Sequence, residues 1–315
     1  MLASAAMPRR APPPPVRLAT GVASMLAAMA ILPVQDGIAK HLMEDLPLGQ
    51  VVWARYAFHL ALLAPVLLVR FGPRSLIPDR LGAQVLRGVL LLAGTTLFFA
   101  SLRFLPIADT LALFFVSPLV VTILAPWLLG EPVGWRRALA VAVGLVGVAI
   151  IVRPGSGVFG PAALLGLGAG TLNAFYFIVT RRIAGSAPPL LTLGYTALVG
   201  TVATSLVVPL SWAPLGGTEL AWMLLLGLCG ACAHLLIIEA FERAPAAWLA
   251  PVGYAEIVMA TVVGLLWFGD FPDRWAWVGI AVVIASGVYV SWRERRVYGR
   301  RAVALAEVDT DARNA

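Results

Sequence analysis

Ten long apolar segments, separated by short charged or Pro/Gly-rich breaks, constrain this chain more than any other feature of its 315-residue sequence. A helix needs about 20 mostly apolar residues to cross a bilayer, whereas a membrane strand needs about 10 residues of alternating polarity. The segments have helical length and no two-residue alternation. We therefore expect an all-α integral membrane protein with ten transmembrane helices near residues 18–38, 48–69, 84–102, 107–128, 135–152, 160–180, 190–210, 220–241, 246–268 and 275–292.

The composition agrees with this fold class. Apolar residues make up 60% of the chain and charged residues 12%, against roughly 45–50% and about 25% in soluble domains. The mean hydropathy is +0.90. Outside the apolar segments there are only short loops, a tail at residues 1–16 and a basic tail at 293–315, so the sequence leaves no room for a soluble catalytic domain.

The second half of the sequence repeats the first. Gly130-Glu131-Pro132 closes the fourth segment, and Gly269-Asp270-Phe271-Pro272 closes the ninth, 139 positions later. Five is an odd number of crossings, so the second half starts from the opposite face of the membrane. Inverted repeats of this kind are typical of secondary transporters. We expect a first repeat at residues 17–153 and a second at 157–292.

The basic residues give the orientation. The net charge of +7 is spread by loop instead of forming one basic face, which argues against a nucleic-acid partner. If the N-terminus is cytoplasmic, most of the 23 Lys and Arg residues fall on the cytoplasmic side, as the positive-inside rule requires. We expect both termini in the cytoplasm of a multi-pass protein of the bacterial inner membrane.

Charged residues inside the apolar segments are the main candidates for function, because a charge at the centre of a membrane helix costs roughly 2.5–3.5 kcal/mol. Arg55 and His59 share one face of the second segment, and Glu256 lies half-way along the ninth. Glu256 corresponds to Ser117 at the offset of 139. Arg55 either attracts an anionic substrate group or holds the two halves together. Glu256 either binds a cation or a coupling proton, or is a buried structural partner.

Further polar residues suggest a central cavity. Asp36 and Lys40 are four residues apart near the outer end of the first segment, where an ion pair within one helix and an outer gate would look alike. Uncharged candidates for the cavity lining are Gln35, Thr96, Asn173, Tyr176 and Tyr195. Each of these, taken alone, is equally compatible with hydrogen bonding between helices.

Prolines and absent motifs add to this picture. Pro118 and Pro251 are expected to break the fourth and ninth helices, although they do not align at the repeat offset. The sequence lacks a P-loop motif, a metalloprotease motif and a serine nucleophile elbow. With three histidines, we expect neither a metal site nor a cofactor. Cys229 and Cys232 are interpreted as small packing residues in a helix.

The chain resembles ten-helix transporters of the EamA type in the drug/metabolite transporter superfamily. The resemblance rests on Arg87-Gly88, the stretch from Ala108 to Pro118, Gly130-Glu131 and their second-half counterparts, and it covers residues 17–292. Asp270 and Ile257 depart from the Glu and Pro of many relatives. The first four helices also resemble the subset linked to uptake of S-adenosylmethionine or riboflavin.

This resemblance implies secondary active transport by alternating access, with Arg55 and Glu256 at positions where the family often carries a membrane arginine and an acidic residue. Its members move amino acids, vitamins, nucleotide-like metabolites, amines or drugs. The expected partners are a small-molecule substrate, the lipid bilayer and, as a candidate coupling ion, H+. The alternatives are an integral membrane enzyme and a membrane sensor or scaffold. The sequence fixes neither the substrate, nor the direction, nor the oligomeric state.

Overall fold

The computed structural model describes residues 15–72, 77–78, 80–129, 135–152, 160–183, 185–244, 249, 252–289 and 292. Within these ranges the secondary structure is helical. The helices are α1 (Pro15–Asp45), α2 (Leu48–Phe71), α3 (Leu81–Leu102), α4 (Ile107–Phe114), α5 (Ser117–Leu129), α6 (Trp135–Val152), α7 (Pro161–Arg182), α8 (Pro189–Val207), η2 (Val208–Ser211), α9 (Gly217–Arg243), α11 (Ala255–Val263), η3 (Gly264–Phe268) and the helix Arg274–Tyr289.

The described part of the chain contains seven helical spans that are long and apolar enough to cross a membrane. Three shorter apolar helices accompany them, at Ala138–Ile151, Ala255–Phe268 and Arg274–Tyr289. The expectation of an all-α integral membrane protein is confirmed. Glu131 and Pro251 lie outside the described residues.

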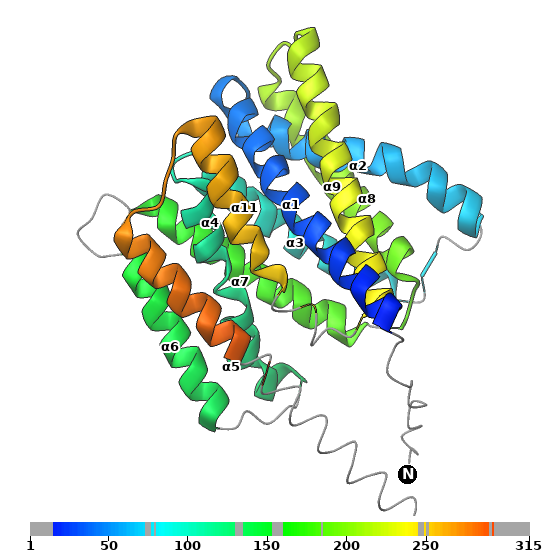
Figure 1. Cartoon of the computed structure of the whole chain (residues 1–315). Coiled ribbons are helices and arrows are strands. Elements are labelled where there is room, and N and C mark those ends of the chain that lie inside the picture. The colour runs from blue at the N-terminus through cyan, green and yellow to red at the C-terminus, as the bar shows by residue number, and fades with distance from the viewer. Residues whose placement is uncertain are drawn as a thin grey trace, which may run out of the picture.

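Helices from the two halves of the sequence lie against each other throughout the bundle. Figure 1 shows α1 running beside α9, and α6 beside the helix Arg274–Tyr289 at one edge. Glycine permits the second contact, because a Cβ atom added at Gly279 would lie 2.5 Å from Ile151. Ser286 also donates a hydrogen bond of 2.6 Å to the Ala140 carbonyl oxygen. Small residues and interhelical hydrogen bonds are the usual means of helix association in lipid.

The fourth apolar segment is broken into α4 and α5. Pro118 is the second residue of α5, and α4 ends four residues before it, at Phe114. A proline removes the hydrogen bond to the carbonyl four residues earlier and clashes with it, so the break lies where the sequence places it. Gly170 of α7 accommodates the break, because a Cβ atom there would lie 2.5 Å from the Phe114 carbonyl oxygen.

A second change of backbone conformation lies at the equivalent place in the other half. Tyr254, just before α11, has φ −71° and ψ −12°, while Phe115, just after α4, has φ −69° and ψ 4°. The two residues are 139 positions apart, which is the offset of the sequence repeat. Their rings contact each other, with centroids 5.1 Å apart. The two irregular points therefore meet at the boundary between the repeats.

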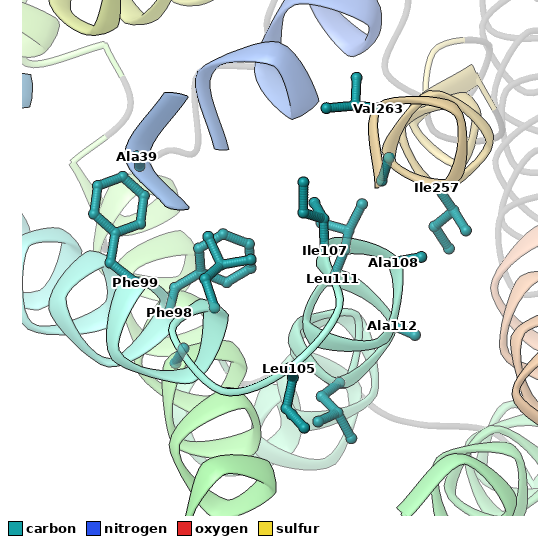
Figure 2. Close-up of a cluster of buried hydrophobic side chains, with 14 of the residues drawn as sticks. Ala39, Phe98, Phe99, Leu105, Ile107, Ala108, Leu111, Ala112, Ile257 and Val263 are labelled. Atoms are coloured by element: carbon teal, nitrogen blue, oxygen red, sulfur yellow. The ribbon is translucent and has the colours of Figure 1, made fainter. Parts of the chain in front are cut away.

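A core of buried side chains surrounds this boundary. Figure 2 shows Phe98 and Phe99 of α3, Leu111 of α4, and Ile257 and Val263 of α11 around one interior region. Because lipid chains are as apolar as these side chains, close packing between helices has to supply most of the stabilisation. This core fixes the first turns of α5 and α11 relative to α1 and α3.

Candidate functional site

A cavity of about 390 Å³ lies between the two halves of the sequence. Helices α1 to α5 line it from the first half, and α7, α9 and α11 from the second half. The volume lies within the range of small-molecule sites, about 300–1,000 Å³. Aromatic side chains form much of the wall, and they surround the ionisable groups of Asp36, Arg55, His234 and Glu256.

Three of these ionisable groups come from three different helices. Arg55 of α2, Asp36 of α1 and Glu256 of α11 line the cavity together. Within the described residues neither carboxylate forms an ion pair with Arg55. Buried charges in membrane proteins usually pair directly or face a polar cavity. Here both carboxylates and the guanidinium line the same cavity, where they remain available to a bound molecule.

Arg55 is held in place by uncharged neighbours. Its Nη1 donates a hydrogen bond of 3.3 Å to Thr95 Oγ1 on α3, and the Tyr56 hydroxyl lies 3.0 Å from the same oxygen. The guanidinium also lies over the rings of Tyr56 and Phe99, at 5.7 and 5.4 Å from their centroids. Cation–π contacts of this kind favour the charged group without neutralising it.

Ser117 and Glu256 occupy corresponding helix starts. Ser117 is the first residue of α5, and Glu256 lies in the first turn of α11. The N-terminus of a helix favours a carboxylate, so the break before α11 helps to stabilise Glu256. Asn173 Nδ2 of α7 donates a hydrogen bond of 3.2 Å to Ser117 Oγ. The repeat thus places a neutral amide–hydroxyl pair and a carboxylate around the same cavity.

Lys40 lies one turn beyond Asp36 along α1, outside the cavity wall. Lys40 Nζ lies 2.8 Å from Asp270 Oδ2 and donates a second hydrogen bond of 3.2 Å to the Leu105 carbonyl oxygen. It also lies 4.9 Å from the centroid of the Phe268 ring. Gly269, with φ +70°, turns the chain after η3 and brings Asp270 to this position. Lys40 therefore pairs across the repeats and not with Asp36.

The lining residues define which half of the bundle the cavity occupies. On α1 they run from Met25 to Asp36, and on α9 from His234 to Phe241. The cavity thus extends from Asp36 toward the start of α1 and the end of α9. The Lys40–Asp270 ion pair lies on the opposite side of Asp36, toward the end of α1.

Other residues proposed from the sequence lie outside the cavity wall. His59 is buried against His234, with ring centroids 5.6 Å apart, and Gln35 is fully buried beside Gly230. Thr96 donates its hydrogen bond to Leu92 of its own helix. Tyr195 packs against a cluster of leucines between α2 and α8. Any role in binding for these four residues remains a prediction.

The structure also reveals a residue whose place the sequence reasoning missed. Arg87 is one of the basic residues that a cytoplasmic N-terminus places on the cytoplasmic side, but it lies in the second turn of α3 and is 6% exposed. Its hydrogen-bond partners lie on α7 and α8 and include Tyr176 of the cavity wall. Its position four residues before Leu91 and eight before Thr95 was the signal, because that spacing marks one helix face.

Comparison with known proteins identifies the family. The model of the EamA-like transporter family matches residues 19–153 and again residues 160–292. The chain belongs to this family. Each match covers one half of the sequence, so the chain has a two-repeat architecture, and the family is one of transporters and not of enzymes.

Two curated relatives align with about nine-tenths of the chain. An S-adenosylmethionine uptake transporter of Rickettsia felis is 26% identical over 282 residues, covering 90% of this chain and 96% of the relative. A riboflavin transporter of Vibrio cholerae is 28% identical over 290 residues, covering 90% and 97%. A solved protein structure with 17% identity superposes with a TM-score of 0.62 over 90% of this chain and 98% of its own, which shows a shared fold.

Proposed function

We propose that this protein is a secondary active transporter that carries a small organic metabolite through the cavity by alternating access. The observation that carries the proposal is the meeting of Asp36, Arg55 and Glu256, from both halves of the sequence, in one cavity at the repeat boundary. The proposal includes two repeats of inverted topology, at residues 17–153 and 157–292. It also places the protein in the bacterial inner membrane with both termini in the cytoplasm.

The charges and walls of the cavity suit a substrate with both a charged and a flat part. Two carboxylates and one arginine can bind a cationic or zwitterionic group, while the rings of Phe98, Phe114 and Phe115 can stack on a planar group. S-Adenosylmethionine, named for one relative, has both parts, and riboflavin, named for another, has a large planar part. These two compounds are the substrates to test first.

Alternating access gives the Lys40–Asp270 pair a role. In the arrangement described, this pair closes one end, and with a cytoplasmic N-terminus the cavity faces the cytoplasm. To release or admit substrate on the other face, α1 and the segment after η3 have to separate. Asp36 then belongs to the binding cavity and Lys40 to the gate, whereas the sequence offered both residues as an outer gate or as an ion pair within one helix.

Flux measurements with purified protein in proteoliposomes test the proposal. We expect saturable uptake of S-adenosylmethionine or riboflavin, and at least about tenfold slower uptake for Glu256→Gln or Arg55→Ala, since each loses a charge that faces the substrate. Glu242→Gln is the matched control, because Glu242 is an exposed carboxylate near the end of α9. Full activity in both cavity variants would reject this site, and absence of flux in the unaltered protein would reject these substrates.

Proton coupling is a separate part of the proposal and rests on the two carboxylates of the cavity. If Glu256 carries the coupling proton, an imposed pH gradient accelerates flux in the unaltered protein but not in Glu256→Gln. Flux that is indifferent to the pH gradient in the unaltered protein would remove H+ as the coupling ion and leave the substrate site unaffected.

A further inference from the structure

Arg87 is a buried positive charge with neutral partners. Its Nε donates to Thr180 Oγ1 at 2.8 Å, and its Nη1 donates to the Thr192 carbonyl oxygen at 2.9 Å and to Thr196 Oγ1 at 2.6 Å. Within the described residues it forms no ion pair. Burying an unpaired charge costs several kcal/mol. Connecting α3 to α7 and α8 does not by itself explain why an arginine occupies this position.

The remaining contact of Arg87 leads to the cavity. Its Nη2 donates to the Tyr176 hydroxyl at 2.5 Å, and its Cζ lies 4.6 Å from the centroid of the same ring. Tyr176 lines the cavity. Two contacts with one guanidinium fix both the position of the ring and the position of its hydroxyl oxygen.

The chemistry of this contact sets the direction of a hydrogen bond. A guanidinium has only donors, so the phenol oxygen of Tyr176 has to accept. The proton of the phenol is then left to donate elsewhere, and within the described residues the Tyr176 hydroxyl has Arg87 as its sole hydrogen-bond partner. A neutral glutamine or serine in place of Arg87 would allow the phenol to donate backwards instead.

We propose that Arg87 is a positioning residue that holds Tyr176 with its hydroxyl as a hydrogen-bond donor toward the transported molecule. This inference rests on the proposed function and adds a substrate preference to it. The substrate should present an acceptor, such as a carboxylate, carbonyl or ring nitrogen, to this wall of the cavity. A site built to hydrogen-bond a substrate group discriminates strongly against analogues that lack it.

The arrangement along α3 supports the inference. Arg87, Leu91 and Thr95 follow one another at intervals of four residues and so share one face of the helix. Leu91 and Thr95 line the cavity, and Thr95 accepts the hydrogen bond from Arg55. One face of α3 thus positions both Arg55 and Tyr176. The Thr95 hydroxyl accepts a hydrogen bond from Arg55, and the Arg87 guanidinium donates one to Tyr176.

A spectroscopic measurement tests the contact without a substrate. The chain has six tyrosines, so in protein labelled with ¹³C at tyrosine Cζ the Tyr176 resonance is identified by its loss in Tyr176→Phe. We expect Arg87→Met to shift this resonance and Arg80→Met to leave it in place. Arg80 is the matched control, because it also reaches α7, through the Arg182 carbonyl oxygen, but is exposed. Arg87→Gln replaces Arg87→Met if the latter does not fold.

A double-mutant cycle then separates positioning from a general structural role. Binding of riboflavin and of S-adenosylmethionine is measured for Arg87→Met, Tyr176→Phe and the double variant. We expect each single variant to bind the transported compound about tenfold more weakly, and the double variant to be no weaker than either, since both remove the same hydrogen bond. Arg87→Lys keeps a donor and is expected to recover part of the affinity.

Two results would overturn the inference. One is a Tyr176 resonance that does not move in the Arg87 variants, and the other is a double variant about 100-fold weaker, the product of two independent losses. Failure of the proposed function gives a different result from both, because the unaltered protein then shows no flux and binds neither compound. The Tyr176 resonance still tests the contact with Arg87 in that case.

Discussion

Breaking the ion pair between Lys40 and Asp270 is expected to open the closed end of the bundle. The pair joins α1 of the first repeat to Asp270, two residues after η3 of the second. In the proposed mechanism this pair belongs to the gate between the cavity and that face of the membrane. A change in its strength should therefore change the equilibrium between the two states.

The magnitude follows from geometry and exposure. The Nζ–Oδ2 distance is 2.8 Å, and the two side chains are 16% and 31% exposed. Exposed pairs contribute about 0–1 kcal/mol, while removal of one partner of a fully buried pair costs about 3–5 kcal/mol. A half-buried pair lies between these limits, at about 2 kcal/mol. Lys40→Met or Asp270→Asn should then favour the open end roughly 30-fold.

Labelling of a cavity cysteine measures this shift. In a background with Cys229 and Cys232 replaced by alanine, Leu32→Cys places a single thiol in the cavity wall. A membrane-impermeant thiol reagent is added on the side where Lys40 lies. We expect either single variant to be labelled roughly ten- to 30-fold faster than the background protein, because the thiol is reached through the opened end.

The exchanged pair is the control. Lys40→Asp combined with Asp270→Lys restores an ion pair with the charges reversed, so its labelling should return toward the slow rate. An unchanged rate in both single variants would refute the reasoning. So would an exchanged pair that is labelled as fast as the single variants.

Three further predictions concern packing and polarity. Gly170→Leu should prevent folding or lower the thermal midpoint of unfolding strongly, because the leucine side chain would meet the Phe114 carbonyl oxygen. Gly82→Ala is the control: there is open space at its Cβ, so the midpoint should stay unchanged or rise slightly. Asn173→Leu should lower the stability by about 1–3 kcal/mol, since it removes the bond to Ser117, and chemical unfolding measures this. Gly279→Leu should separate α6 from the helix Arg274–Tyr289 and lower stability, while the Kd for substrate, measured on the folded fraction, should stay the same because neither helix lines the cavity.

The position of the break before α5 could be read from the sequence, but its symmetry could not. Pro118 determines where the hydrogen-bond ladder fails, since a proline acts on its own helix. Pro251 does not align with it, and the sequence therefore suggested asymmetric breaks. In the structure Phe115 and Tyr254 have the same backbone conformation at the repeat offset and contact each other. This depends on packing between helices, which no local residue pattern encodes.

The partners of charged residues likewise depend on contacts between helices and not on local sequence. The spacing of Asp36 and Lys40 put them on one face of one helix, and two interpretations remained. In the structure Lys40 binds Asp270, which lies 230 positions away, and the outer gate stays a prediction. Arg87 was hidden for a related reason. An arginine near a helix end reads as a loop residue, and only the approach of α7 and α8 provides the hydrogen bonds that allow its burial.

The sequence by itself determined that this is a helical membrane protein with two related halves and that a few charges would lie within the bilayer. These properties follow from local rules: apolar length sets membrane crossing, and the high cost of a buried charge makes each intramembrane charge conspicuous. Only the tertiary structure decided which charged residues line one cavity, which wall Tyr176 belongs to and which residue pairs with Lys40. Those properties arise from contacts between residues far apart in the chain, where close packing and hydrogen-bond geometry select one partner among several that the sequence allows.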